Sequence, residues 1–271
     1  MDKTRPIALT AGTAGAFALL FSATPALADS HTATVSVLHA IPDTPVDVYA
    51  NGERLIDDFA PGTLAGPLEL PAGDYDLAVF PADAADASGT PLLSATDVAV
   101  PAGANATVVA HLTEAGEPAL TPFANDTSAV PAGQARVTVR HTAAAPAVDV
   151  RAGGEVVAPG LTNPNEATLE VPAGTITADV TLAGTDTVAI GPADLALEEG
   201  TSTIVYAWGS GDAGYELATQ TITGLHSSPS GVPGGSAGLV DDGLPLPLVG
   251  LSVLGLAGAA VAGRRLVTSR V

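Results

Sequence analysis

The sequence predicts an all-β protein: two tandem immunoglobulin-like β-sandwich domains between an N-terminal signal peptide and a C-terminal transmembrane helix. The middle of the 271-residue chain repeats itself once, each copy alternates apolar and polar residues with a period of two, and both ends carry uncharged apolar segments. In chain order we expect a signal peptide at 1–28, a first sandwich at 29–123, a linker at 124–134, a second sandwich at 135–223, a flexible stalk at 224–243, a transmembrane helix at 244–262 and a basic cytoplasmic tail at 263–271.

The N-terminus has the three parts of a secretory signal. Lys3 and Arg5 supply the positive start, residues 7–21 carry no charge, and Ala26-Leu-Ala28 fits the small-x-small cleavage rule. A membrane anchor at this end is the alternative, but the run is short and a processing site follows at once. The mature chain is therefore expected to begin near Asp29.

The duplication is read from landmarks that recur in the same order. A His, an Asp and a Gly turn recur at an offset of 102 residues: His39, Asp47 and Gly52 against His141, Asp149 and Gly154. Further pairings that the sequence suggests are Pro61-Gly62 with Pro159-Gly160, Leu70–Gly73 with Val171–Gly174, and Thr107–Ala110 with Thr203–Tyr206. A whole domain has been duplicated, and no short repeat is present.

Within each copy the pattern is that of half-buried strands. Val35 and Val37 alternate with polar neighbours, as do Val137 and Val139, and Gly, Pro, Asn and Asp break the runs about every ten residues. No segment before the C-terminal apolar run has sustained helical periodicity. This spacing predicts about seven short strands per copy, which is the size of an immunoglobulin-like sandwich.

The composition of the chain excludes several classes of function. Residues 29–243 contain 28 acidic residues against four arginines and no lysine, a formal charge of about −24. Such a surface repels nucleic acid, so no nucleic-acid partner is expected. The absence of cysteine from the whole chain excludes disulfides, zinc–thiolate sites and thiol nucleophiles. Phosphate-loop, dinucleotide and His-Glu-x-x-His motifs are also missing, and no cofactor is predicted.

The C-terminal apolar run predicts a single membrane span. Residues 244–262 are uncharged, and a helix of this length rises about 28 Å, close to the ~30 Å hydrocarbon core. Arg264, Arg265 and Arg270 follow the run, so the tail is expected in the cytoplasm and the ectodomain outside. Sortase attachment to the cell wall is the alternative, but Leu244-Pro-Leu-Pro-Leu248 lacks the Thr-Gly pair at which the bond would be cut.

The segment from His39 to Gly52 carries a family resemblance. Its wording, His39-Ala-Ile-Pro-Asp-Thr-Pro-Val-Asp47-Val-Tyr-Ala-Asn-Gly52, followed by Leu70-Pro-Ala-Gly-Asp-Tyr75, closely resembles the bacterial domain-of-unknown-function family 4397. The second copy is degenerate: it keeps His141, Pro146 and Asp149 but has lost the Pro-Asp-Thr-Pro run. The resemblance implies a secreted β-sandwich module and implies no activity.

His39, Asp43 and Asp47 form the most distinctive polar cluster. They are weak candidates for a cation site, which Asp57 and Asp58 could join, or for general-base chemistry. Because the His and the later Asp recur at 141 and 149 while Asp43 does not, a structural His–Asp hydrogen bond that holds a strand turn is the favoured interpretation.

Three other residues are candidates for ligand binding. His111 is interpreted as an edge-strand residue with no counterpart in the second copy, where Ala207 stands. Trp208 beside Tyr206 would fit a sugar platform, but packing within the sandwich is the commoner role for such a pair.

Together these features predict a non-catalytic, single-pass cell-membrane protein with an extracellular ectodomain. Its tandem sandwiches would make structural or adhesive contacts with an unknown envelope or extracellular partner. A cation- or carbohydrate-binding surface protein is the alternative.

Overall fold

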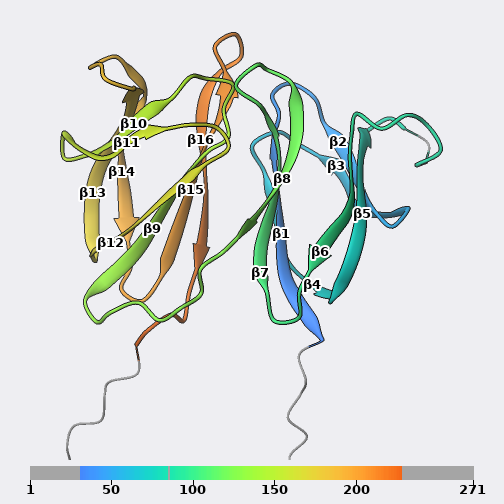
Figure 1. Ribbon diagram of the computed structural model, residues 1–271, viewed down its shortest axis with the longest axis horizontal. Coiled ribbons are helices and arrows are strands. Elements are labelled where there is room, and N and C mark those ends of the chain that lie inside the picture. Colours follow the sequence, from blue (N-terminus) through green and yellow to red (C-terminus); the bar gives the residue numbers. More distant parts are fainter. Residues whose placement is uncertain (1–30, 85, 228–271) are drawn as a thin grey trace, which may run out of the picture.

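The computed structural model describes residues 31–84 and 86–227, and all regular structure in these residues is β-strand (Figure 1). Sixteen strands form four sheets of four, which confirms the prediction of an all-β fold with tandem β-sandwiches. Along these residues there is no helix with the length and apolarity needed to cross a membrane. The predicted signal peptide, the transmembrane helix at 244–262, the tail and most of the stalk lie outside the described residues.

The first copy has eight strands in two sheets. One sheet has the order β4-β1-β7-β8 and the other β3-β2-β5-β6. The bounds are β1 (Thr32–Ala40), β2 (Val46–Ala50), β3 (Glu53–Phe59), β4 (Leu64–Pro71), β5 (Gly73–Pro81), β6 (Leu93–Val100), β7 (Asn105–Leu112) and β8 (Pro118–Ala124).

The second copy repeats this topology strand for strand, with sheets β12-β9-β15-β16 and β11-β10-β13-β14. Its bounds are β9 (Gln134–His141), β10 (Val148–Ala152), β11 (Glu155–Leu161), β12 (Glu166–Pro172), β13 (Gly174–Leu182), β14 (Val188–Leu197), β15 (Ser202–Ser210) and β16 (Gly214–Ile222).

Eight strands per copy is one more than the spacing of breaks predicted. Segments with prolines interrupt the sequence pattern but still form strands at sheet edges, where a missing N–H breaks no ladder. Strand β8 is such an edge, with Pro118 and Pro122 opposite Leu112 and Val108 of β7.

Alternate residues of each strand form the core of its own sandwich, as the period of two predicted. Val35 and Val37 of β1 point inward in the first copy, and Val137 and Val139 of β9 do so in the second. Each of these strands lies in the middle of its sheet and pairs in parallel with a late strand, β1 with β7 and β9 with β15.

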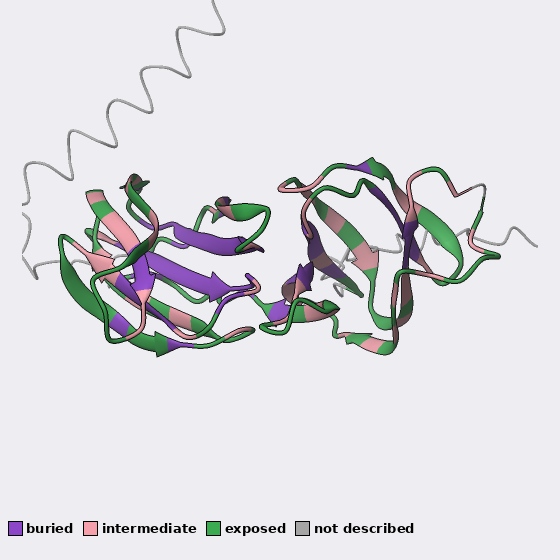
Figure 2. Ribbon diagram, turned by 90° about the horizontal axis from the view of Figure 1, so that it is seen from above, coloured by how far each residue is buried: buried purple, intermediate pink, exposed green. Residues whose placement is uncertain are grey.

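The two sandwiches pack against each other through the sheets that contain β1 and β9 (Figure 1). A shared apolar cluster joins them, with members from both copies: Leu38, Ala40, Val109, Phe123, Ile204, Tyr206, Trp208 and Ala218. Central strands are consequently covered on both faces, and residues 202–209 of β15 are all buried. Figure 2 shows burial running along these inner strands, while the outer strands alternate mainly between intermediate and exposed residues. The described part of the chain is thus a stack of four sheets.

The strand pairing corrects two of the predicted correspondences between the copies. Val46 pairs with Phe59 and Val148 with Leu161, so Gly160 corresponds to Asp58 and not to Gly62. His39 pairs with Ala110 and His141 with Ala207, so residues 107–110 correspond to 204–207 and not to 203–206, and the residue equivalent to His111 is Trp208. The segments between these landmarks differ in length between the two copies, so similar short motifs do not mark equivalent residues.

Candidate functional site

The signature histidine of each copy holds the loop that follows its own strand. His39 is fully buried, and its Nε2–H donates to the carbonyl oxygen of Thr44 at 2.7 Å. His141 bonds the carbonyl of Pro146 at 3.0 Å in the same way. Because Thr44 and Pro146 stand at equivalent positions, both histidines determine the path of the chain between the first two strands.

The signature aspartate makes a separate set of contacts. Asp47 Oδ1 accepts from the backbone N–H of Asp58 at 2.9 Å, and Asp149 Oδ1 accepts from that of Gly160 at 2.7 Å. The second oxygen of Asp149 accepts from Gly184 N at 2.8 Å. The predicted hydrogen bond between the signature His and Asp is therefore wrong: each side chain bonds backbone groups of a different turn.

Burial sets the protonation of the signature histidines. Desolvation lowers the pKa of His39 and His141, although the hydrogen bond to a carbonyl opposes the shift in each. The backbone N–H groups of Gly184 and Gly160 lower the pKa of Asp149. The histidines are therefore neutral hydrogen-bond donors and Asp149 an ionised acceptor near neutral pH.

The residues predicted as a cation site are only partly brought together. Asp47, Asp57 and Asp58 place carboxylate oxygens within 4.8 Å of one another, whereas His39 and Asp43 are not in this group. Arg54 lies among them, with Nη1 at 3.1 Å from Asp47 and 2.7 Å from Asp57. The positive charge that this carboxylate group needs is thus supplied by the chain itself.

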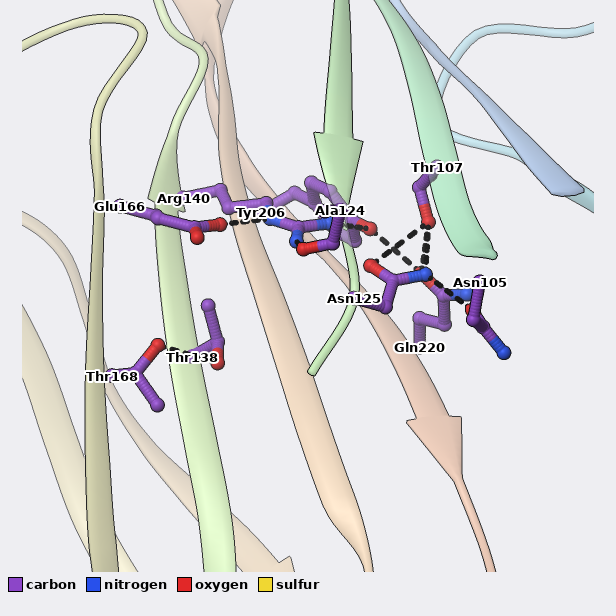
Figure 3. Close-up of polar contacts among 10 residues, drawn as sticks. All are labelled: Asn105, Thr107, Ala124, Asn125, Thr138, Arg140, Glu166, Thr168, Tyr206 and Gln220. Carbon is purple, nitrogen blue, oxygen red and sulfur yellow. Dashed lines mark hydrogen bonds and ion pairs between the residues drawn. The ribbon is translucent and has the colours of Figure 1, made fainter. Parts of the chain in front are cut away.

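A buried arginine organises the contact between the sandwiches (Figure 3). Arg140 is 1% exposed; its Nε donates to Glu166 at 2.7 Å and its Nη1 to the hydroxyl of Tyr206 at 2.9 Å, both in the second copy. Its Nη2 reaches the first copy, at the carbonyl of Ala124, and its guanidinium lies 4.5 Å from the ring centre of Phe123. Arg140 therefore binds both copies through hydrogen bonds and a cation–π contact.

A chain of amide and hydroxyl groups continues across the interface. The hydroxyl of Tyr206 and that of Thr107 both donate to Gln220 Oε1, at 2.7 and 2.9 Å, and Gln220 Nε2 donates to Ser36 at 3.2 Å. Asn125 closes the network by donating to Thr107 at 3.0 Å. A buried polar group without a partner is costly, so this network favours one relative placement of the two copies.

The segment between the copies is held by the second copy. Arg136, 3% exposed, donates to the carbonyls of Asp126 and Ser128 at 3.2 and 3.0 Å and to Glu170 at 2.8 Å. Val130 is fully buried and exchanges backbone hydrogen bonds with residues 225 and 227. These contacts fix the segment in place.

Two expectations about ring side chains have different outcomes. Tyr206 and Trp208 are 0% and 6% exposed in the interface core, so packing is their role, as favoured. His111 is not an edge residue: β7 lies between β1 and β8, and its ring bonds Leu112 O and Thr121 Oγ1 at 2.9 and 2.8 Å. Burial and the nearby His141 lower the pKa of His111, and its hydrogen bond to Leu112 opposes this.

A pocket of about 360 Å³ opens at one end of the interface. The loop Pro42–Pro45 and Pro61 line it from the first copy; Trp208 and the turn between β15 and β16, with Glu216, line it from the second. The signature loop held by His39 therefore forms one wall of a pocket that exists only because the copies are packed together.

Comparison with protein-family models identifies the family to which the first copy is similar. The resemblance to family 4397 is confirmed. The family model, described as "Domain of unknown function (DUF4397)", matches residues 33–151. This match covers the first sandwich and ends in β10, so the assignment of the second copy to DUF4397 stays a prediction. No curated protein matches the chain.

One solved structure adds little to this. A crystal structure of a proposed cell adhesion protein from Bacteroides uniformis is 10% identical, with 71% of this chain and 96% of that chain covered. Its TM-score of 0.19 is too low for the likeness to support a fold or a function.

Proposed function

We propose that the chain is a non-catalytic, membrane-anchored surface protein whose paired sandwiches make structural or adhesive contacts in the cell envelope. The observation that carries the proposal is the buried interface, in which Arg140 bonds Ala124, and Gln220 bonds Thr107 and Ser36, across the two sandwiches. This arrangement suits a module that presents a fixed surface to a partner.

The buried histidines and the arginines are engaged in bonds within the fold, which supports a contact role and not a catalytic one. The three buried histidines, His39, His111 and His141, all bond carbonyl oxygens of their own copy. The four arginines of the described residues all form ion pairs: Arg54, Arg136, Arg140 and Arg151. These groups stabilise the fold, and the remaining surface is strongly acidic, which favours contact with a basic or neutral partner.

Protease treatment of intact cells tests the proposal. The full chain, carrying an epitope tag after Val271, is expressed in a Gram-positive host and exposed to a non-penetrating protease. We expect the ectodomain to be lost while a small tagged fragment remains with the membrane. An intact chain on whole cells that is digested only after lysis would contradict the surface location, and substrate turnover by the purified chain would contradict the non-catalytic role.

Proximity crosslinking on the same cells then identifies the contact. A photoreactive residue is placed at Val156, which is 50% exposed on the outer sheet, or at Asp43 beside the pocket. Crosslinking of an envelope component from either position supports a contact function, and its absence from both positions would count against it.

A further inference from the structure

The pocket at the end of the interface has two carboxylates and no basic residue in its lining. Asp43 and Glu216, one from each copy, are both exposed. Neither side chain forms an ion pair or a hydrogen bond with any described residue, and the four arginines of this region are paired elsewhere. No arginine of the described residues is therefore left to neutralise the pocket.

The carboxylate of the first copy stands on a loop that is already ordered. Pro42 and Pro45 restrict the backbone on either side of Asp43, whose φ of 63° lies in the left-handed region. The hydrogen bond from His39 to Thr44 holds the same loop from beneath. A ligand that binds here loses little free energy to loop ordering.

The remaining lining consists of prolines, small residues and the indole of Trp208. Trp208 is 6% exposed, and its Nε1–H has no acceptor among the described residues. Prolines and the indole offer a surface for the methylene stem of a long side chain, while carboxylates at the rim would bind its charged end. The Nε1 atom itself is buried, so the indole contributes to the pocket as an apolar surface.

We propose that this pocket binds an arginine or lysine side chain of a protein partner. The inference deepens the proposed contact function and rests on it for the nature of the partner. The signature loop of the second copy cannot supply an equivalent carboxylate, because Ala145 stands there in place of Asp43 and is itself 6% exposed. The Pro-Asp-Thr-Pro run, which the fold alone does not require, thereby acquires a role.

The only tryptophan of the chain lies in the pocket and reports on binding directly. The full chain in detergent micelles is titrated with N-acetyl-arginine amide and N-acetyl-lysine amide, and with N-acetyl-citrulline amide as the uncharged near-isostere of arginine. We expect the two basic probes to shift the Trp208 emission and its single indole N–H resonance, and citrulline to do so at least tenfold more weakly.

Charge-neutralising variants separate the pocket from the general acidity of the surface. Asp43→Asn and Glu216→Gln are each expected to weaken binding of the basic probes several-fold. Glu155→Gln, the same change at an exposed position outside the pocket lining, should leave binding unaltered. An equal response to citrulline, an equal loss in Glu155→Gln, or no response to the basic probes would overturn the pocket proposal, whereas the surface location is decided separately by the protease experiment.

Discussion

Arg140 is the residue on which the interface most depends. It is buried, and its donors reach Glu166, Tyr206 and the carbonyl of Ala124 in the other copy. The Glu166 side chain is 39% exposed, so the cost of truncating Arg140 comes from the buried Tyr206 hydroxyl losing a donor and from the cavity left beside Phe123, together about 2–5 kcal/mol. We therefore expect Arg140→Ala to lower the free energy of unfolding by about that amount, as measured by urea denaturation.

Arg54→Ala is the matched control for this prediction. The Arg54 side chain is 45% exposed, and after its removal Asp47 still accepts a hydrogen bond from Asp58 N. Because the Asp47 carboxylate is fully buried, the loss of its charged partner should still cost about 1–3 kcal/mol, but no buried cavity is left, so the loss should be smaller than for Arg140→Ala. Equal losses in the two arginine variants would show that Arg140 has no special role.

The buried histidines make stability depend on pH. Burial lowers the pKa of His39, His111 and His141 in the folded chain, so on acidification the unfolded chain takes up protons first. The free energy of unfolding should fall once the pH drops below about 6.5, the ordinary histidine pKa. Each histidine contributes a slope of up to about 1.4 kcal/mol per pH unit until its folded-state pKa is reached.

Urea denaturation between pH 8 and pH 5 measures this slope. His111→Asn should remove roughly a third of it, since one of three buried histidines is gone. His31→Gln, at an exposed position, should leave it unchanged. A flat profile in the unmodified chain would rule out the histidines as the origin of acid sensitivity; loss of hydrogen bonds to Asp149, whose pKa is lowered from 3.8, belongs to a more acidic range.

At the scale of the strand, the burial of one face of β1 could be predicted from the sequence, but the burial of its other face could not. Val35 and Val37 alternate with Ser36 and Thr34, which reads as one apolar and one solvated face. In the structure Ser36 is 4% exposed, because the second face of β1 packs on the other copy. Small hydroxyl side chains are compatible with water and with a buried polar network alike, so periodicity cannot separate the two.

The hidden interface did leave a signal in β9. Arg136 and Arg140 lie on the same face of this strand, although residues 29–243 contain only four arginines and no lysine. Arginine is the basic residue best suited to buried ion pairs, so two arginines on one strand face indicate that this face is buried in an interface. The signature His and Asp have structural roles, but most of their partners are backbone groups, which residue identities do not reveal.

Asp47 and Asp149 hold equivalent turns in the two copies, and substitutions in these turns measure their backbone strain. The equivalent residues Asp58 and Gly160 both have positive φ, 49° and 64°, and no atom lies within 4 Å of a Cβ built on Gly160. Gly160→Ala should therefore cost about 1 kcal/mol from backbone strain alone. Asp58→Gly should relieve the corresponding strain in the first copy. Urea denaturation of both variants measures the effects, and opposite signs are expected.

At the scale of the whole molecule, the divergence of the two copies follows from their packing. Leu38 of the first copy corresponds to Arg140 of the second, and Val109 corresponds to Tyr206. In both cases the larger, polar side chain of the second copy meets small or apolar residues of the first in one shared core. The degeneracy of the second copy is thus partly specialisation of its inner face, which makes the pair asymmetric and disfavours pairing of two identical copies.

A shared core predicts that the two sandwiches unfold together. Calorimetry of the full chain should show a single transition, because separating the copies exposes the cluster around Tyr206 and breaks the hydrogen bonds of Arg140 to Ala124 and of Gln220 to Thr107 and Ser36. Gly62→Ala should break this coupling. Its φ is +74°, and an added Cβ would lie 2.8 Å from Cζ2 of Trp208, which forces the indole out of place.

Gly116→Ala provides the control for that variant. Its φ of +80° imposes the same backbone strain, but nothing lies within 4 Å of its Cβ. It should lower the midpoint slightly and keep one transition, whereas Gly62→Ala should give two transitions and a red-shifted Trp208 emission. Two transitions in the unmodified chain would mean that the interface contributes little free energy. The pocket beside Asp43 would then lack a stable second wall, since Trp208 and Glu216 both belong to the other copy.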